Sequence, residues 1–187
     1  TVSALAGDFL KEKFKVPIFE VITPAIDSAI SVGSKRIGVI GTRGTIASLA
    51  HQSAIEKKSP QTKVFSRACP LFVPLVEENW LSRKETKTIA KAYLQNLKIK
   101  NIDSLILGCT HYPMLKKIIQ EKIGRRVRLI DPAEATAKAL FDFLNNNPEF
   151  FKKQSQQDYY CTDVGGRFKE LAEAWLKEKI DLKKAEL

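Results

Sequence analysis

Apolar runs that do not alternate with polar residues constrain this chain's fold more than any other feature of its sequence. Residues 37–40 read Ile-Gly-Val-Ile, and residues 105–107 read Leu-Ile-Leu. A strand with one face in water alternates apolar and polar side chains, whereas a parallel strand covered by helices on both faces is apolar throughout. Helix patterns lie between these runs. We therefore predict an α/β fold with three layers, αβα, around a mainly parallel sheet.

The same patterns place the individual elements along the chain. We predict six strands, at residues 16–22, 36–41, 62–68, 104–109, 127–131 and 158–162. Seven helices are predicted, at residues 2–13, 24–32, 45–58, 83–97, 113–123, 133–145 and 167–179. Pro24 and Pro113 fit these assignments because a helix tolerates proline in its first turn.

Composition excludes several classes of protein. With 187 residues, 44% of them hydrophobic and 28% charged, the chain matches globular proteins and not disordered or collagen-like ones. No apolar run approaches the roughly 20 residues of a membrane-spanning helix. Three cysteines, an odd number, predict free thiols in a cytoplasm. The formal net charge of +10 makes nucleic acid one partner to consider. Lysines and glutamates are interleaved on the predicted helices, however, so we interpret the positive charge as part of a solvated surface.

Ligands of open parallel sheets bind beyond the carboxyl ends of the strands, so the residues there are the candidates for a site. Thr42 and Thr45 follow the strand at 36–41, next to two glycines and at the start of a helix. Glycine lets a ligand approach the backbone, and free N–H groups at a helix start favour an anion. The alternative is an ordinary turn with a threonine cap.

A second strand end carries a thiol and an imidazole two residues apart, Cys109 and His111. A nearby helix start lowers the pKa of a thiol, and the histidine can exchange a proton with it. Thr110 and the local amides could hold a carboxylate. The alternative is a buried cysteine that packs like a small apolar residue. Glu77 or Glu78 would orient the imidazole if it pointed at His111, and would otherwise belong to a solvated turn.

The remaining cysteines and histidine receive structural interpretations. We expect Cys69 and Cys161 to pack in a core, and His51 to be a surface or packing residue. No two cysteines form a Cys-x-x-Cys pair, so we predict no metal site.

Taken together and in this order, the segments resemble glutamate racemases of the aspartate/glutamate racemase superfamily. The most specific are Cys-Pro-Leu-Phe-Val-Pro-Leu-Val-Glu at residues 69–77 and Gly-Cys-Thr-His-Tyr-Pro at residues 108–113. Further similar segments lie at residues 16–25, 37–45, 129–131 and 167–172, so the resemblance covers nearly the whole chain.

The resemblance implies a reaction and the residues for it. The family interconverts L- and D-glutamate without a cofactor, by means of two cysteines on opposite faces of Cα, and the D-glutamate supplies peptidoglycan. Cys109 matches the second of these cysteines, His111 the histidine that assists it, and Glu77 the glutamate of the catalytic site. The positions that hold or surround the substrate are matched by His111 and by four threonines: Thr1, Thr42, Thr45 and Thr110.

The family's first catalytic cysteine and its aspartate have no match in this sequence. Thr1 matches the threonine of the family's Ala-Cys-Asn-Thr segment, so we expect the chain to start two residues after that cysteine and to be inactive as a racemase alone. The family fold has two similar α/β domains with the site between them. We expect residues 24–130 to form the complete second domain, and residues 1–23 and 131–187 the incomplete first domain.

Two other functions stay open at this point. One is a non-catalytic, carboxylate-binding or structural α/β module, and the other is a racemase of another acidic amino acid such as aspartate. For partners we expect glutamate as a small-molecule substrate and a homodimer. We expect no nucleic acid, no membrane, no metal and no cofactor.

Overall fold

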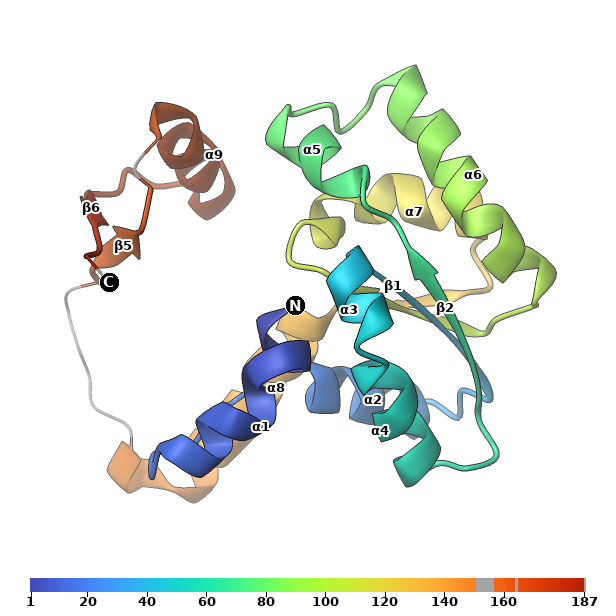
Figure 1. Ribbon diagram of the computed structural model, residues 1–187, viewed down its shortest axis with the longest axis horizontal. Helices are drawn as coiled ribbons and strands as arrows, with labels where there is room; N and C mark the ends of the chain where they lie inside the picture. Colours follow the sequence, from blue (N-terminus) through green and yellow to red (C-terminus); the bar gives the residue numbers. More distant parts are fainter. Residues whose placement is uncertain (151–156, 164, 187) are drawn as a thin grey trace. The chain divides into compact units, whose positions relative to one another are not determined.

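The structure is a computed structural model that describes residues 1–150, 157–163 and 165–186. The chain divides into two compact units, residues 1–146 and residues 147–187. The first unit is a sheet with helices on both sides (Figure 1). The expected domain boundaries at residues 24 and 130 stay a prediction.

Four parallel strands form the main sheet, in the order β2 (Lys63–Ala68), β1 (Arg36–Gly41), β3 (Ser104–Gly108) and β4 (Arg128–Ile130). Every neighbouring pair in this sheet is parallel. The predicted α/β class with a mainly parallel sheet is confirmed. These four strands lie within one residue of their predicted ends.

Helices cover both faces of the sheet. On one face lie α2 (Ile22–Ser31) and α4 (Ala50–Lys58), and on the other lie α6 (Lys84–Ile99) and α7 (Lys116–Ile123). The unit also contains α1 (Val2–Lys13), α3 (Arg43–Ala47), α5 (Phe72–Glu77), the 3-10 helix η1 (Tyr112–Leu115) and α8 (Pro132–Asn146).

Each face of the sheet has its own hydrophobic core. Ile37 and Val39 of β1 pack with α2 and α4, whereas Ile40 packs with α6 and α7. All three side chains are fully buried, and burial of each stabilises the fold by about 1.5–3 kcal/mol. Successive side chains of a strand point to opposite faces. Since both faces are covered, the strand has no polar side chain from Ile37 to Gly41.

The strand predicted at residues 16–22 is not formed. Residues 14–21 have no regular structure, and Ile22 already begins α2. The carboxylate of Glu20 accepts hydrogen bonds from the backbone N–H groups of Ile22 and Thr23, at 2.6 and 2.9 Å, and so caps this helix. A strand is stable only beside neighbouring strands, and none of the described strands pairs with this segment.

The helix predicted over residues 45–58 is wrong as a single element. α3 ends at Ala47 and α4 begins at Ala50, and between them Leu49 has a left-handed backbone with φ of 56°. This conformation is costly for leucine, so the residue type gives no sign of it. The helix predicted from residue 113 likewise opens with η1, and α5 was not predicted.

The second unit contains the 3-10 helix η2 (Pro148–Phe150), α9 (Gly166–Leu176) and a two-stranded parallel sheet of β5 (Tyr159–Cys161) and β6 (Leu182–Lys184). The strand predicted at 158–162 is confirmed, but it pairs with β6 and is not part of the main sheet. In neither unit does the structure describe a helix that is long and apolar enough to cross a membrane.

Tyr112 provides a test of the packing beneath the site. Its side chain is fully buried, and its hydroxyl donates a hydrogen bond to the backbone carbonyl of Cys69 at 2.9 Å. Tyr112→Phe is expected to lower the free energy of unfolding by about 1–2 kcal/mol, because a buried carbonyl loses a partner. Urea unfolding measures this.

The matched control is Tyr93→Phe. The Tyr93 hydroxyl accepts a hydrogen bond from the backbone N–H of Leu71 at 3.3 Å in an exposed position, so its loss should change stability by less than about 0.5 kcal/mol. Equal losses of unfolding free energy in Tyr112→Phe and Tyr93→Phe would show that the buried hydrogen bond stabilises the fold no more than the exposed one.

Candidate active site

The carboxyl edge of the main sheet brings the predicted segments together. Gly41 at the end of β1 lies beside Gly108 at the end of β3. The backbone N–H of Cys69, just after β2, donates to the carbonyl of Gly41 at 2.9 Å. The segments that follow β1, β2 and β3 therefore all start from one edge, although they are far apart in the sequence.

A thiol, an imidazole and a carboxylate lie in a row at this edge. Cys109 Sγ is 3.9 Å from His111 Nδ1, and His111 Nε2 is 3.3 Å from Glu77 Oε1. Thr110 Oγ1 lies 3.4 Å from the same Nδ1. Glu77 is the last residue of α5, so this helix, which the sequence did not predict, positions the carboxylate.

The thiol and the imidazole favour each other's charged forms. Burial alone would raise the pKa of the Cys109 thiol, but the hydrogen bonds and charge of His111 outweigh burial and bring that pKa below its ordinary value. The hydrogen bond to Cys109 raises the pKa of His111 more than burial lowers it, and the charges of Cys109 and Glu77 add to the rise. The geometry therefore favours a thiolate beside an imidazolium, and the thiolate is the reactive form of cysteine.

Three threonine hydroxyls form a closed triangle near this pair. The Oγ1 atoms are 2.9 Å apart for Thr1 and Thr42, 3.0 Å for Thr1 and Thr45, and 2.9 Å for Thr42 and Thr45. A hydroxyl can donate one hydrogen bond and also accept. A carboxylate only accepts, so on binding it can take over the protons that the hydroxyls now share among themselves.

A pocket of about 140 Å³ opens between these groups. It is smaller than the roughly 300–1,000 Å³ of sites for drug-sized ligands, which suits a molecule the size of an amino acid. Four predicted site residues line the pocket: Thr1, Thr45, Cys109 and Thr110. Three other predicted site residues do not line it. Thr42 is hydrogen-bonded to Thr45, His111 contacts Cys109, and Glu77 contacts His111.

Three polar residues that the sequence did not predict for the site also line the pocket: Ser3, Asp131 and His51, the last of which was expected to be a surface or packing residue. Asp131 directly follows β4, and its Oδ1 accepts a hydrogen bond from the backbone N–H of Ala133 at 3.0 Å. His51 is only 5% exposed, and burial lowers the pKa of His51 to about 4, so its ring is neutral at neutral pH. The place of Asp131 after a strand was a usable signal. No signal in the sequence shows that α4 brings His51 to the pocket.

Gly108 is required by the close approach of β1. A Cβ at this position would lie 2.7 Å from the carbonyl oxygen of Ile40 and 3.5 Å from the ring of His51. The first of these contacts is to backbone, which cannot rotate away as a side chain can. The absence of a side chain at Gly108 therefore lets Cys109 start directly from the edge of the sheet.

The other two cysteines do not line the pocket. Cys69 is fully buried, as predicted, and burial raises the pKa of its thiol to about 12. Cys161 was expected to pack in a core, and this is wrong, since it lies half-buried in β5. The physical reason is that a sheet of two three-residue strands offers little surface to cover it.

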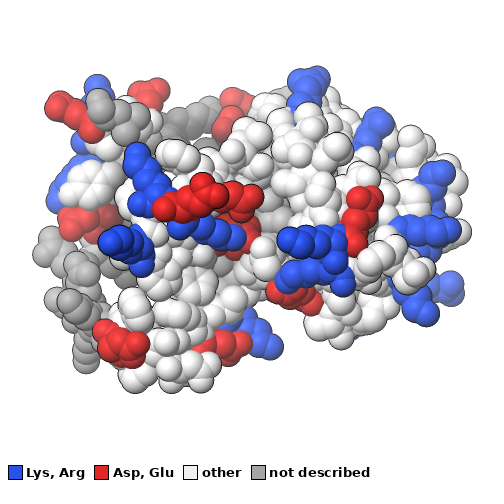
Figure 2. Space-filling view, turned by 60° about the horizontal axis from the view of Figure 1, so that its bottom comes forward, with Lys and Arg blue, Asp and Glu red and all other residues white. Residues whose placement is uncertain are grey.

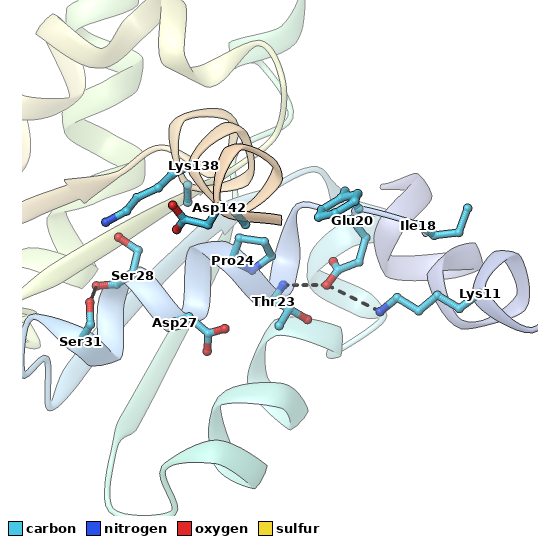
Figure 3. Close-up of a pocket in the computed structure, with 13 residues that line it drawn as sticks. Lys11, Ile18, Glu20, Thr23, Pro24, Asp27, Ser28, Ser31, Lys138 and Asp142 are labelled. Atoms are coloured by element: carbon cyan, nitrogen blue, oxygen red, sulfur yellow. Dashed lines mark hydrogen bonds and ion pairs between the residues drawn. The ribbon is translucent and has the colours of Figure 1, made fainter. Parts of the chain in front are cut away.

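A larger hollow of about 510 Å³ lies among α1, α2 and α8. Figure 3 shows Glu20 directed toward Thr23 and Lys11, with Lys138 and Asp142 extending from α8. Lys11 and Glu20 form an ion pair at 3.9 Å, and neither cysteine nor histidine lines the hollow. The smaller pocket at the strand ends is therefore the candidate for chemistry.

The contents of that pocket define what it can do. The hydroxyls can hold a carboxylate, and the thiolate can accept a proton from a carbon atom placed beside it. Within the described ranges, no three His, Cys, Asp or Glu side chains are grouped so that they could hold a metal ion. The arrangement suits proton transfer on a small molecule that carries a carboxylate.

Comparisons with known proteins show what this chain is similar to. The profile of the family described as Asp/Glu/Hydantoin racemase matches residues 2–140. The glutamate racemase of Geobacter metallireducens is 41% identical over 184 residues, which make up 96% of this chain and 68% of that protein. Two solved structures are similar over 70% of their own chains. Glutamate racemase isoform RacE1 from Bacillus anthracis has a TM-score of 0.93 and is 33% identical, with 99% of this chain covered. Glutamate racemase from Francisella tularensis, in complex with D-glutamate, has a TM-score of 0.90 and is 34% identical, with 100% of this chain covered.

The coupling between His111 and Cys109 predicts how alkylation of the thiol depends on pH. In the unmodified protein, iodoacetamide should react with Cys109 below the pH range of an ordinary thiol, because the thiolate is stabilised. In His111→Ala, nothing from His111 offsets the rise that burial causes in the pKa of Cys109. Alkylation of Cys109 should therefore begin at a higher pH in this variant. Mass spectrometry of the Cys109 peptide measures the rate, and Cys161 in the same samples is the reference. An identical profile in both proteins would contradict the coupling.

Proposed function

Because the chain belongs to the Asp/Glu/hydantoin racemase family, we propose that it takes part in the interconversion of L- and D-glutamate, by moving the proton on one face of Cα. One observation carries the proposal: Cys109, His111 and Glu77 lie in a row, and the thiol of this row enters a pocket that also presents threonine hydroxyls. Glutamate is supported as the substrate because the relatives described above are glutamate racemases.

In the proposed complex, the substrate is held by its charged groups. One carboxylate accepts hydrogen bonds from the hydroxyls of Thr1 and Thr45, which line the pocket, while the Thr42 hydroxyl is hydrogen-bonded to both of them. Asp131 is the one acidic residue among those lining the pocket, and it is suited to pair with the ammonium group. This orientation directs Cα toward the thiol.

The difficult step is removal of the proton from Cα, which is a very weak acid. In the proposed reaction the Cys109 thiolate takes this proton, so that an S–H bond forms as the C–H bond breaks, and the electron pair left on Cα is delocalised into the adjacent carboxylate. His111 stabilises the thiolate before the transfer, and Glu77 stabilises the imidazolium. The partial burial of the thiolate strengthens these interactions, because the effective dielectric constant is lower there than in water.

Cys109 accounts for one face of Cα. It is the one cysteine of the three in the sequence that lines the pocket. Return of a proton from the same thiol restores the original enantiomer, whereas inversion needs a donor on the opposite face. Exchange of the α-proton with solvent is therefore the half-reaction that this thiol can perform by itself.

We extend the proposal to the cell. The D-glutamate would supply peptidoglycan synthesis, and the protein would act in the cytoplasm as a homodimer. The three free thiols support a reducing compartment. The peptidoglycan role and the homodimer are supported by the resemblance to the family alone.

Isotope exchange tests the role of Cys109. In D₂O the 187-residue chain should replace the α-proton of glutamate with deuterium slowly, and should form little D-glutamate from L-glutamate, because a single thiol lines the pocket. Proton NMR follows the exchange, and chiral chromatography follows inversion. Cys109→Ala should abolish exchange, whereas Cys161→Ala, which removes a thiol outside the pocket, should leave it unchanged.

Two outcomes of this experiment would contradict the proposal. Exchange that persists in Cys109→Ala would show that another group removes the proton. General-base catalysis accelerates a reaction at least roughly 100-fold, so the incubation must be long enough to detect exchange at 100 times the uncatalysed rate. If the unmodified chain shows no exchange under these conditions, the proposed function is contradicted.

His111 should affect the rate without affecting the fold. His111→Ala is expected to slow exchange by about 10²–10⁴-fold, the usual contribution of a group in acid–base catalysis. Glu77→Gln should cause a smaller loss, because Glu77 acts through His111. Since both side chains lie at the surface edge of the site, urea unfolding should stay cooperative. If His111→Ala lost cooperative unfolding as well as the exchange rate, His111 would instead have a structural role.

A further inference from the structure

The amino edge of the main sheet, opposite the candidate active site, carries eight of the chain's 31 Lys and Arg residues. The four connections that enter the strands are residues 32–36, 59–63, 98–103 and 124–128. They contain eight basic residues: Lys35, Arg36, Lys63, Lys98, Lys100, Arg125, Arg126 and Arg128. We call this group the basic edge. Figure 2 shows Lys and Arg side chains spread over the right-hand side of that view, with few acidic side chains among them.

The charges of the basic edge are available to a partner. Seven of the eight residues are exposed, and Arg36 is half-buried. Among the described residues, no Asp or Glu forms an ion pair with any of them. The one acidic residue in the four connections is Asp103, whose Oδ2 accepts hydrogen bonds from the backbone N–H groups of Lys35 and Arg36 at 2.8 and 3.1 Å. The basic edge is therefore not neutralised from within the described part of the chain.

The parallel register arranges these charges in a row. Arg36 pairs with Lys63 across β1 and β2, and Ser104 pairs with Arg128 across β3 and β4. The guanidinium of Arg36 donates to the carbonyl of Lys100 at 2.9 and 2.6 Å, which joins the connections of β1 and β3. With strands about 4.8 Å apart, the row spans roughly 14 Å across the sheet.

A linear polyanion fits a row of unpaired cations. Four of the eight residues are arginines, whose planar guanidinium binds phosphate through two hydrogen bonds. The four connections contain no aromatic residue, so they offer no side chain for stacking on bases and none of the aromatic anchors that help a protein to enter a bilayer surface. A phosphodiester backbone, contacted through phosphates alone, matches these features best.

We propose that the basic edge binds the phosphodiester backbone of nucleic acid without sequence preference. This revises the expectation from sequence of a merely solvated surface, because the sequence does not show that the four connections meet at one edge. The edge lies at the opposite ends of the strands from Cys109, about 20 Å away for strands of this length, so binding there leaves the pocket open. The proposal does not depend on the proposed reaction.

Fluorescence anisotropy with a labelled 20-base-pair DNA duplex at 50–200 mM NaCl tests the proposed binding. The unmodified chain should bind, and the logarithm of its affinity should fall linearly with the logarithm of salt concentration, with a slope of about −0.9 for each phosphate contacted. A triple variant of the basic edge should bind at least ten times more weakly and show a shallower slope; it combines Arg125→Glu, Arg126→Glu and Arg128→Glu. A duplex of unrelated sequence should give the same result.

A control with equal charge separates the basic edge from net charge. Lys84, Lys91 and Lys117 are basic residues of α6 and α7 outside the four connections, and reversing them together to Glu should change affinity less than threefold. A second edge variant, Lys35→Glu with Lys63→Glu and Lys100→Glu, should repeat the loss if the first is poorly folded. Circular dichroism checks the fold of each.

Three results would overturn the proposal. No binding by the unmodified chain at 50 mM NaCl would exclude it. Equal losses in the edge and control variants would show that net charge alone attracts the duplex. Tighter, edge-dependent binding to vesicles of phosphatidylglycerol than to the duplex would assign the basic edge to an anionic membrane surface.

Discussion

The parallel pairing of β1 with β3 is the constraint on which the rest of the site depends. It sets Gly41 beside Gly108, so the threonines after one strand and the thiol after the other begin at the same edge. Gly108 makes this possible, because a side chain there would collide with the backbone of β1. The apolar side chains of β1 and β3 are buried under helices on both faces, and this burial fixes the register that the site requires.

The two edges of the same sheet have opposite electrostatic character. At the carboxyl edge, single charges are paired: the thiol with the imidazole, and the imidazole with Glu77. The pairing stabilises a thiolate despite its partial burial. At the amino edge, eight cations have no carboxylate partner among the described residues. One edge is thus suited to chemistry on a small anion, and the other to contact with an extended one.

The sequence predicts the parts of this structure that depend on local pattern, and misses those that depend on distant neighbours. Strands at 36–41 and 104–109 are recognisable because both faces are buried, and Cys109 and His111 because they follow a strand. The apolar segment at 16–22 has the same pattern, but no described strand lies beside it and Glu20 caps α2 instead. The left-handed backbone of Leu49 and the approach of His51 to the pocket are set by tertiary packing. Glu77 reaches His111 only because α5 forms, and this six-residue helix, with a proline at its third position, was not predicted from the sequence.

The central claim is that Cys109 and His111 stabilise each other's charge, and the titration of His111 measures this most directly. NMR of the imidazole of His111 gives its pKa in the unmodified protein and in Cys109→Ser, which keeps the shape of the side chain but removes the thiolate. Because the hydrogen bond to Cys109 and its negative charge raise the pKa of His111, we predict that this pKa falls in the variant. A His111 pKa that is the same in both proteins would contradict the account.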